Sequence, residues 1–320
     1  LIFVGYFLFI TAALGTIGLR KVLRVFLVGS TCYLLVAWGA YLLVPSFGRF
    51  YEYTDATTTV TRMGGVAHPN AIAAEASVAL LVCCAVIRDR RPGQRMGRWA
   101  SVGWALLITL ILATLYATMS RTAVLAAVAG LVMLMFDKLY GRRGALMLVG
   151  AVTLGASGLF VTMLTTTESV GDSAVAAVTK SDNVEELTSL TGRTEIWAEA
   201  ISLIVQRPLT GYGLDSAASV MSEKSVGTHN LFLNVVFSTG IITGIFMLLL
   251  LGATLYLAFA SDNPLFRGIS TFVLISGLVD DTLFASFPCP ITFLWISMLM
   301  SMSPPDRWRH SNTPSSALGG

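Results

Sequence analysis

The chain has 320 residues, of which 55% are hydrophobic and only 12% are charged, and its mean hydropathy is +0.74. The formal net charge is a small +3. These values exclude an ordinary water-soluble protein and indicate an integral membrane protein, because lipid must be the solvent for most of its surface. The lipid bilayer is therefore the first expected partner, and we expect no nucleic-acid partner.

Apolar segments long enough to cross a membrane recur along the chain. A helix needs roughly 20 apolar residues to cross the bilayer core, where no water satisfies open backbone groups. About nine such segments lie near residues 1–19, 25–44, 67–87, 99–117, 122–137, 144–164, 230–257, 268–285 and 289–303. The predicted fold is all-α, a polytopic membrane helix bundle. Because the chain starts at Leu1 inside an apolar run, we expect an N-terminal truncation with further spans upstream.

These segments divide the chain into four parts. Residues 1–164 hold transmembrane helices 1–6, and residues 165–229 form a large loop with short amphipathic helices. Residues 230–303 hold transmembrane helices 7–9. Residues 304–320, rich in Pro, Ser and Gly, are expected to be a disordered cytoplasmic tail.

The distribution of basic residues predicts the orientation. If the first span ends in the cytoplasm, the inner connections contain 14 of the 21 Lys and Arg residues. They are Arg20, Lys21, Arg24, Arg88, Arg90, Arg91, Arg95, Arg98, Lys138, Arg142, Arg143, Arg267, Arg307 and Arg309. Because short cytoplasmic loops carry an excess of Lys and Arg, the large loop is expected outside the cytoplasm.

The first outer segment, residues 45–66, leads to His68-Pro69-Asn70 at the mouth of the third span. It is either an interfacial loop with aromatic residues at headgroup level or part of a binding surface. Glu75 follows His68 by seven residues, two helical turns along one face and about 10 Å by helix rise. We expect both side chains to line one cavity.

The large loop has local structure of its own. The spacing of Asp182 and Glu185 matches a capping box and predicts a short helix through residues 184–190. From Ile196 to Val205 the apolar residues follow helical spacing, which predicts an amphipathic helix that Pro208 ends. The glycines of Gly211-Tyr212-Gly213 then predict a turn.

Three arginines occupy unusual positions. Arg207 lies near a helix C-terminus, where the dipole favours a cation, so a structural role is as open as substrate binding. Arg193 lies near the N-terminus of that helix, where a cation is unfavourable unless an anion is close. Arg121 separates two apolar runs and either snorkels to headgroups or binds an anionic headgroup, since its donor fork fits phosphate. Asp280-Asp281 mark a polar cavity or pair with Arg121 or Arg193.

His229 is the best candidate for chemistry. It is the outermost residue of a long apolar span, and a neutral imidazole can take a proton from a sugar hydroxyl. Asn230 would then orient it or bind substrate, although a lone interfacial histidine can also be a satisfied polar residue. The scattered cysteines and histidines lack metal-ligand spacing, so no metal and no cofactor is expected.

These motifs together resemble the O-antigen ligase and O-antigen polymerase family of bacterial envelopes. The segments that carry the resemblance are 191–197 (TGRTEIW), 207–213 (RPLTGYG), 228–233 (THNLFL), Gly240, and the earlier 68–70 (HPN) and 120–122 (SRT). Their order around a large loop is fairly specific, whereas each short motif alone is weak. The resemblance covers roughly residues 60–260.

The resemblance implies a metal-independent glycosyltransferase-like enzyme on the outer face of the inner membrane. Its donor is a polyprenyl-pyrophosphate-linked glycan, and its acceptor is the hydroxyl of a saccharide or glycolipid. On the matching positions, His229 would be the base, while Arg121 and Arg193 would bind the pyrophosphate. Asn230, Arg207, His68, Asn70 and Glu75 are the predicted substrate-binding residues. Without a convincing protein nucleophile, the transfer is expected to invert the anomeric carbon.

Two other functions remain open from the sequence. A transporter or flippase of lipid-linked saccharides would use the same arginines and Glu75 along a path through the membrane. A non-catalytic scaffold of an envelope assembly complex would not need His229. The motifs do not separate a polymerase from a ligase, because both use the same donor.

Overall fold

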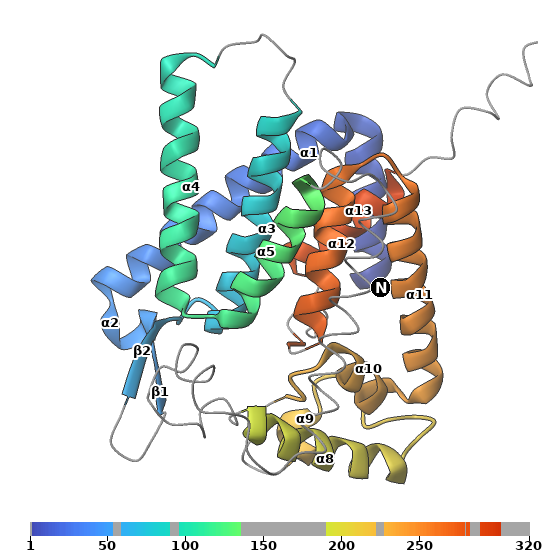
Figure 1. Cartoon of the computed structure of the whole chain (residues 1–320). Helices are drawn as coiled ribbons and strands as arrows, with labels where there is room; N and C mark the ends of the chain where they lie inside the picture. The colour runs from blue at the N-terminus through green and yellow to red at the C-terminus, as the bar shows by residue number, and fades with distance from the viewer. Residues whose placement is uncertain are drawn as a thin grey trace, which may run out of the picture.

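The structure, a computed structural model, describes residues 2–53, 59–89, 96–135, 190–221, 227–278, 280–281 and 289–301. These ranges form a bundle of helices with one β-hairpin (Figure 1). The helices are α1 (Ile2–Leu43), α2 (Pro45–Gly48), α3 (Pro69–Arg88), α4 (Arg98–Thr118), α5 (Arg121–Met135), α8 (Leu190–Gln206), α9 (Ala217–Val220), α10 (Leu231–Thr239), α11 (Ile241–Ala260), α12 (Pro264–Gly277) and α13 (Pro290–Met300). The strands are β1 (Arg49–Tyr53) and β2 (Thr59–Met63). The predicted helical character is confirmed, and the hairpin is a departure from it.

Four of the described helices, α1, α3, α4 and α11, are long and apolar enough to cross a membrane. The apolar helices α5, α12 and α13 are shorter. The described residues therefore do not reach the expected number of about nine spans. The predicted span 144–164, most of the predicted loop up to residue 189, and the tail 304–320 lie outside the described residues.

Helix α1 explains part of the difference between the predicted number of spans and the number of long helices described. A straight helix of 42 residues would be about 63 Å long, roughly twice the hydrocarbon thickness of a bilayer. Gly18 interrupts it with φ 73° and ψ 159°, so α1 consists of two helical segments near the predicted spans 1–19 and 25–44. Just after this break, Arg20 pairs with Asp89 at 3.0 Å, which joins α1 to the end of α3.

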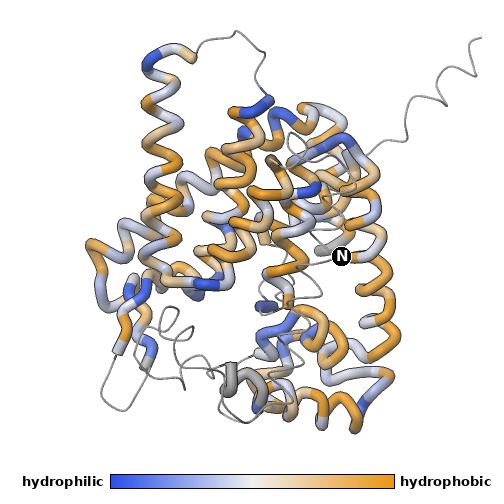
Figure 2. The backbone as a smooth tube through the Cα atoms, viewed as in Figure 1, coloured by the Kyte–Doolittle hydropathy of each residue, from blue (hydrophilic) through white to orange (hydrophobic). Residues whose placement is uncertain are grey.

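Helix α3 is the most enclosed of the four long helices, and it packs against α1, α4, α5 and α12. At the contact of α5 with α12, a Cβ on either Gly130 or Gly268 would lie 2.9 Å from the other's carbonyl oxygen. Small residues allow such close approach of membrane helices. By contrast, α4 exposes large apolar side chains such as Trp99 (87% exposed), and hydrophobic positions run along α4 and α11 (Figure 2). These surfaces suit contact with lipid.

The two ends of the bundle differ in what they carry. One, called here the hairpin end, holds β1, β2, the start of α3, the turn between α4 and α5, α8 and the start of α10 (Figure 1). The other, called the basic end, holds the break in α1, the end of α3 and the starts of α4 and α12. Its basic residues include Arg20, Arg24, Arg88, Arg98 and Arg267.

The predicted span 230–257 consists of two helices, α10 and α11, separated at Gly240 with φ 89°. The chain after α8 packs into this break through its backbone. The Tyr212 N–H donates to the Phe237 carbonyl at 2.9 Å, and the Ile241 N–H donates to the Pro208 carbonyl at 2.8 Å. Helix α8 ends at Gln206, just before Pro208 as predicted.

The predicted turn at Gly211-Tyr212-Gly213 is also confirmed, because both glycines have positive φ, 61° and 103°. Helix α8 itself begins at Leu190, six residues before Ile196, where the predicted apolar stripe starts. The segments 207–213 and Gly240, which are far apart in sequence, thus form one backbone-paired unit.

Replacing Gly240 by alanine should destabilise this unit. The added Cβ would meet the backbone of Leu209, and the positive φ would be strained for alanine. We expect Gly240→Ala to cost roughly 1–3 kcal/mol, seen as a lower thermal midpoint in detergent. Gly252→Ala on α11 is the control, since its Cβ meets open space. Equal midpoints for the two variants would contradict the prediction.

Candidate functional site

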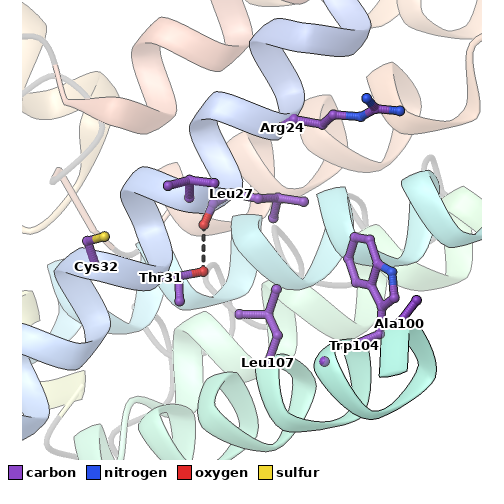
Figure 3. Close-up of a pocket in the computed structure, with 9 residues that line it drawn as sticks. Arg24, Leu27, Thr31, Cys32, Ala100, Trp104 and Leu107 are labelled. Carbon is purple, nitrogen blue, oxygen red and sulfur yellow. Dashed lines mark hydrogen bonds between the residues drawn. The ribbon is translucent and has the colours of Figure 1, made fainter. Parts of the chain in front are cut away.

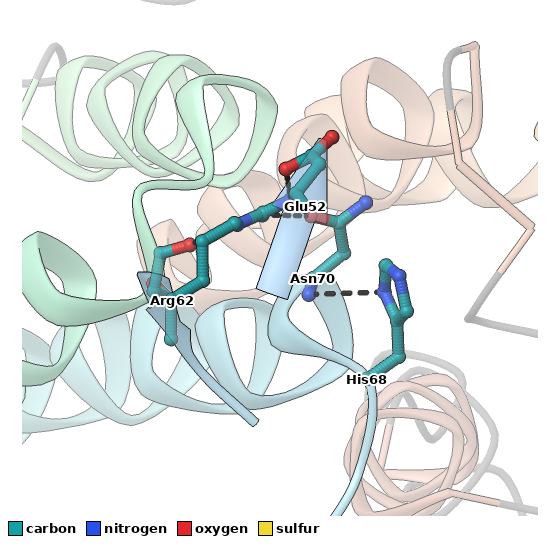
Figure 4. Close-up of polar contacts among 5 residues, drawn as sticks. Glu52, Arg62, His68 and Asn70 are labelled. Carbon is teal, nitrogen blue, oxygen red and sulfur yellow. Dashed lines mark hydrogen bonds and ion pairs between the residues drawn. The ribbon is translucent and has the colours of Figure 1, made fainter. Parts of the chain in front are cut away.

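The buried guanidinium of Arg62 joins three elements at the hairpin end (Figure 4). Its Nε donates to the Thr118 carbonyl at 2.8 Å, and its Nη1 donates to Glu52 Oε2 at 2.7 Å. Its Nη2 donates to Asn70 Oδ1 at 2.9 Å. Because the last carbonyls of a helix lack helical partners, the bond to Thr118 also satisfies the end of α4. The hairpin, the start of α3 and the end of α4 are thereby held together.

The hairpin register brings Arg62 and Glu52 together. Arg62 lies opposite Phe50 in the antiparallel pair, and Glu52 lies opposite Val60. Residues related diagonally in this way lie on the same face of a two-stranded sheet, within reach of long side chains. The salt bridge between Arg62 and Glu52 therefore follows from the local pairing of the two strands.

His68 caps the start of α3. Its Nδ1 accepts a hydrogen bond from the Asn70 N–H at 3.3 Å, and Pro69 occupies the first helical position. The ring packs edge-on against Phe50, with centroids 5.3 Å apart and an interplanar angle of 71°. Because Nδ1 accepts, the proton of the neutral ring lies on Nε2, which can donate to another group.

The surroundings of His68 favour this neutral form. Burial lowers the pKa of His68 below its usual 6.5, and the positive charges of Arg62 and His229 act in the same direction. The carboxylates of Asp280 and Glu52 act in the opposite direction. His68 is therefore within electrostatic reach of the start of α10 and of the chain after α12.

His229 lies where three helices meet. It has φ 49° and directly precedes Asn230, the N-cap of α10. The Asn230 side chain accepts from the Leu233 N–H at 3.0 Å and donates to the Leu278 carbonyl at 2.8 Å. The neighbouring Thr228 carbonyl accepts from Trp197 Nε1 of α8 at 2.8 Å. The position of His229 is thus set by α8, α10 and the end of α12.

Two carboxylates complete the arrangement. Burial raises the pKa of Asp281, and the charge of Asp280 adds to this effect. The charge of His229 and hydrogen bonds from the backbones of Asp281 and His229 act in the opposite direction. We call His68, His229, Asp280 and Asp281 the histidine–carboxylate cluster. Its members come from three separate parts of the chain.

The structure places Arg121 and Arg193 at the same end of the bundle (Figure 1). Arg121 is exposed and begins α5, three residues after Thr118 and hence at most about 11 Å from it along the backbone. Arg193 lies in the first turn of α8, about 6 Å by helix rise before Trp197. Its side chain lies outside the described part of the chain.

Two other predicted residues have contacts away from the cluster. The buried carboxylate of Glu75 accepts a hydrogen bond from Ser30 Oγ of α1 at 2.5 Å. The Arg207 guanidinium lies 4.9 Å from the ring centroid of Tyr212, which favours the structural alternative for this arginine. Asn70 is bonded to Arg62, at the edge of the cluster. Their contacts with substrate stay predictions.

Arg62 and Glu52 were not predicted from the sequence as site residues, and for Asp280 and Asp281 the sequence left a polar cavity and a pairing with Arg121 or Arg193 both open. A signal for the hairpin was present, because the run Thr57–Thr61 consists entirely of β-branched residues and leads to Gly64-Gly65. Such a run bounded by glycines is typical of a strand. No sequence pattern links Asp280 to His68, since their electrostatic interaction depends on how α3 and α12 pack.

An apolar cavity of about 470 Å³ lies beside His229. Helices α8, α10, α11 and α12 form its walls, and Asn230 and Leu278 contribute to the lining. Among its apolar lining residues are Trp197, Phe232, Leu251 and Leu274. Among the residues that the structure describes, no group of three His, Cys, Asp or Glu side chains is placed to hold a metal ion.

The fold and the site define a helical membrane protein with a polar cluster and an adjoining apolar cavity at one end. Residues 104–249 match the family model described as O-antigen ligase. This match confirms the resemblance to the O-antigen ligase and polymerase family, and it includes Arg121, Arg193 and His229. It does not include His68 or the two aspartates. Among curated protein sequences, none matches the chain.

The lowered pKa of His68 predicts how stability depends on pH. Because the folded pKa is below 6.5, unfolding takes up a proton between the two values. The contribution of His68 to the free energy of unfolding is therefore present above pH 6.5 and is lost as the pH falls. We expect the thermal midpoint of the wild type in detergent to fall between pH 7 and pH 5, and that of His68→Asn to fall less. Asparagine can keep the N-cap.

The effect of Asp281 on stability depends on pH in the opposite direction. Because its pKa is raised in the folded protein, its contribution to folding stability is present below the usual 3.8 and is lost as the pH rises. Both proteins retain Asp281, so their difference isolates His68. Identical pH profiles would refute the assignment of a neutral His68.

Proposed function

We propose that this protein transfers a glycan from a polyprenyl-pyrophosphate carrier to the hydroxyl of an acceptor saccharide or glycolipid. The hairpin end would face the outside of a bacterial cytoplasmic membrane, as the positive-inside rule favours. The observation that carries the proposal is the meeting of two histidines and two carboxylates beside an apolar cavity. The match of residues 104–249 to the O-antigen ligase family supports the same reaction class.

His229 acts as the general base in this proposal. It takes the proton of the acceptor hydroxyl, and the oxygen attacks the anomeric carbon of the donor sugar. The bond from that carbon to the pyrophosphate oxygen breaks, and the pyrophosphate leaves with the electron pair. Direct displacement inverts the anomeric carbon. The charge of Asp281 stabilises the protonated imidazole, since the two groups attract each other.

The arginines receive the donor. Arg121 and Arg193 bind the pyrophosphate and stabilise the charge that it gains as it leaves, because guanidinium groups fit phosphate oxygens. His68 and Asn70 lie on the acceptor side, where the Nε2–H of a neutral His68 can donate to a sugar oxygen. Alignment, one base and two cations are sufficient because pyrophosphate is a good leaving group. The reaction needs neither a metal nor a nucleotide sugar.

The apolar cavity beside Asn230 takes the first part of the polyprenyl chain. Its walls are apolar apart from Asn230 and Trp197, and burying hydrocarbon there is favourable. This position would hold the carrier lipid next to His229, with its pyrophosphate at the rim.

The base role predicts that His229→Gln lowers the rate of glycan transfer by roughly 10²–10⁴-fold. The measurement is transfer from a purified lipid-linked donor by the protein in nanodiscs. Arg98→Gln, at the basic end, is the control and should keep the wild-type rate. A His229→Gln variant that retains the wild-type rate with a normal thermal midpoint would exclude His229 as the base.

Alanine variants in cells separate the enzyme from the alternatives. With His229→Ala or Arg193→Ala, an enzyme leaves lipid-linked precursor accumulating outside the membrane, whereas a transporter leaves it inside. Normal polymer in both variants would point to a scaffold. The glycan chain-length profile of a deletion strain then distinguishes a polymerase, which leaves single repeat units, from a ligase, which leaves unattached long chains.

The cavity is tested by the length of the donor lipid. Ala198 lines the cavity, so Ala198→Phe should fill part of it. We expect a higher KM for a donor with a long polyprenyl chain and a smaller change for a donor with a short chain. Ala253→Phe, on the exposed surface of α11, is the matched control. An equal change of KM for both donors would show that the cavity does not bind the polyprenyl chain.

A further inference from the structure

A second groove lies between α1 and α4 (Figure 3), and no member of the histidine–carboxylate cluster lines it. Its volume is about 480 Å³. Helix α1 contributes Arg24, Leu27 and Cys32, and helix α4 contributes Gly103 and Trp104. From Arg24 to Cys32 the α1 wall is about 12 Å long by helix rise.

The walls of this groove are apolar and face outward. Thr31 is the hydroxyl-bearing residue of the lining, and its Oγ1 already donates to the Leu27 carbonyl at 2.6 Å (Figure 3). Among the apolar lining side chains, Val28 is 64% exposed. A surface of this kind suits a hydrocarbon chain of the membrane.

One end of the groove is basic. Arg24 and Trp104 lie toward this end in Figure 3, and Cys32 lies toward the other. The guanidinium of Arg24 is exposed, and within the described part of the chain it takes part in no hydrogen bond or ion pair. Lys21, one turn earlier, is also exposed. Tryptophan is enriched at the headgroup level of membranes, and arginine pairs well with phosphate.

We propose that this groove binds one anionic glycerophospholipid. Its phosphate lies against Arg24 at the level of Trp104, and one acyl chain follows the apolar wall between α1 and α4. Charge complementarity selects the headgroup, because an uncharged or zwitterionic lipid gains less from the arginine. The lipid supports the contact of α1 with α4. This site is independent of the proposed glycan transfer.

Gly103 allows a test that leaves the fold intact. A Cβ at Gly103 would meet nothing within 4 Å, so Gly103→Leu is expected to project into the groove, and it replaces a poor helix former. Gly252→Leu is the matched control, because Gly252 on α11 is also exposed and open. Arg24→Gln removes the charge, and Arg98→Gln removes a basic-end charge that does not line the groove.

The full chain is reconstituted in nanodiscs of phosphatidylglycerol and phosphatidylcholine, and the lipids that it retains are counted by native mass spectrometry. The wild type should retain one phosphatidylglycerol in preference to phosphatidylcholine. Arg24→Gln should reduce this preference about fivefold, and Gly103→Leu should abolish the retained lipid. Both control variants should behave like the wild type.

Three results would overturn the proposal. Equal retention of the two lipids by the wild type would show that the headgroup is not recognised. Unchanged retention in Gly103→Leu would place the lipid elsewhere. A wild type that retains no lipid would show that another part of the chain or a partner helix covers the groove.

Discussion

The buried guanidinium of Arg62 is the interaction on which the hairpin end depends. Its three hydrogen bonds reach the hairpin, the start of α3 and the end of α4, so one side chain links these three elements to one another. A buried arginine without such partners would be very costly, and removal of one partner would leave an unpaired charge. The position of His68 follows from this network, since the neighbouring Asn70 is held by Arg62 and donates to His68.

A second anchor fixes His229 from the opposite side. The turn after α8 pairs with the break between α10 and α11, while Trp197 holds the Thr228 carbonyl. The two anchors act on different helices, and the packing of α12 against α3 and α5 brings their ends together. The cluster is therefore a product of bundle packing, with rigid local supports for each histidine. Such support is what a site needs to hold reacting groups in fixed geometry.

The helical part of this fold was predictable from local pattern, and the site was predictable only in part. Spans such as α3 and α4 agree with the sequence to within two residues, because a long apolar run in lipid has no alternative to a helix. The break at Gly240 was not predicted, since glycine is common inside membrane helices and only the docking of residues 208–213 shows its purpose. Likewise, helical spacing placed Glu75 on the face of His68, but tertiary packing directs its carboxylate to Ser30 on α1.

The charges at the hairpin end also constrain how two substrates could bind there. Asp280 interacts electrostatically with His68 and Asp281 with His229, so a pyrophosphate placed among these groups would be repelled by the two carboxylates. Arg62 cannot offset this repulsion for a ligand, because its three nitrogens are already engaged and it is buried. In the proposed reaction the anion must therefore lie on the side of Arg121 and Arg193, and the neutral acceptor sugar must lie on the side of the cluster. In the proposed reaction this separation would leave the anomeric carbon between the cations and the base, the geometry that an in-line displacement requires.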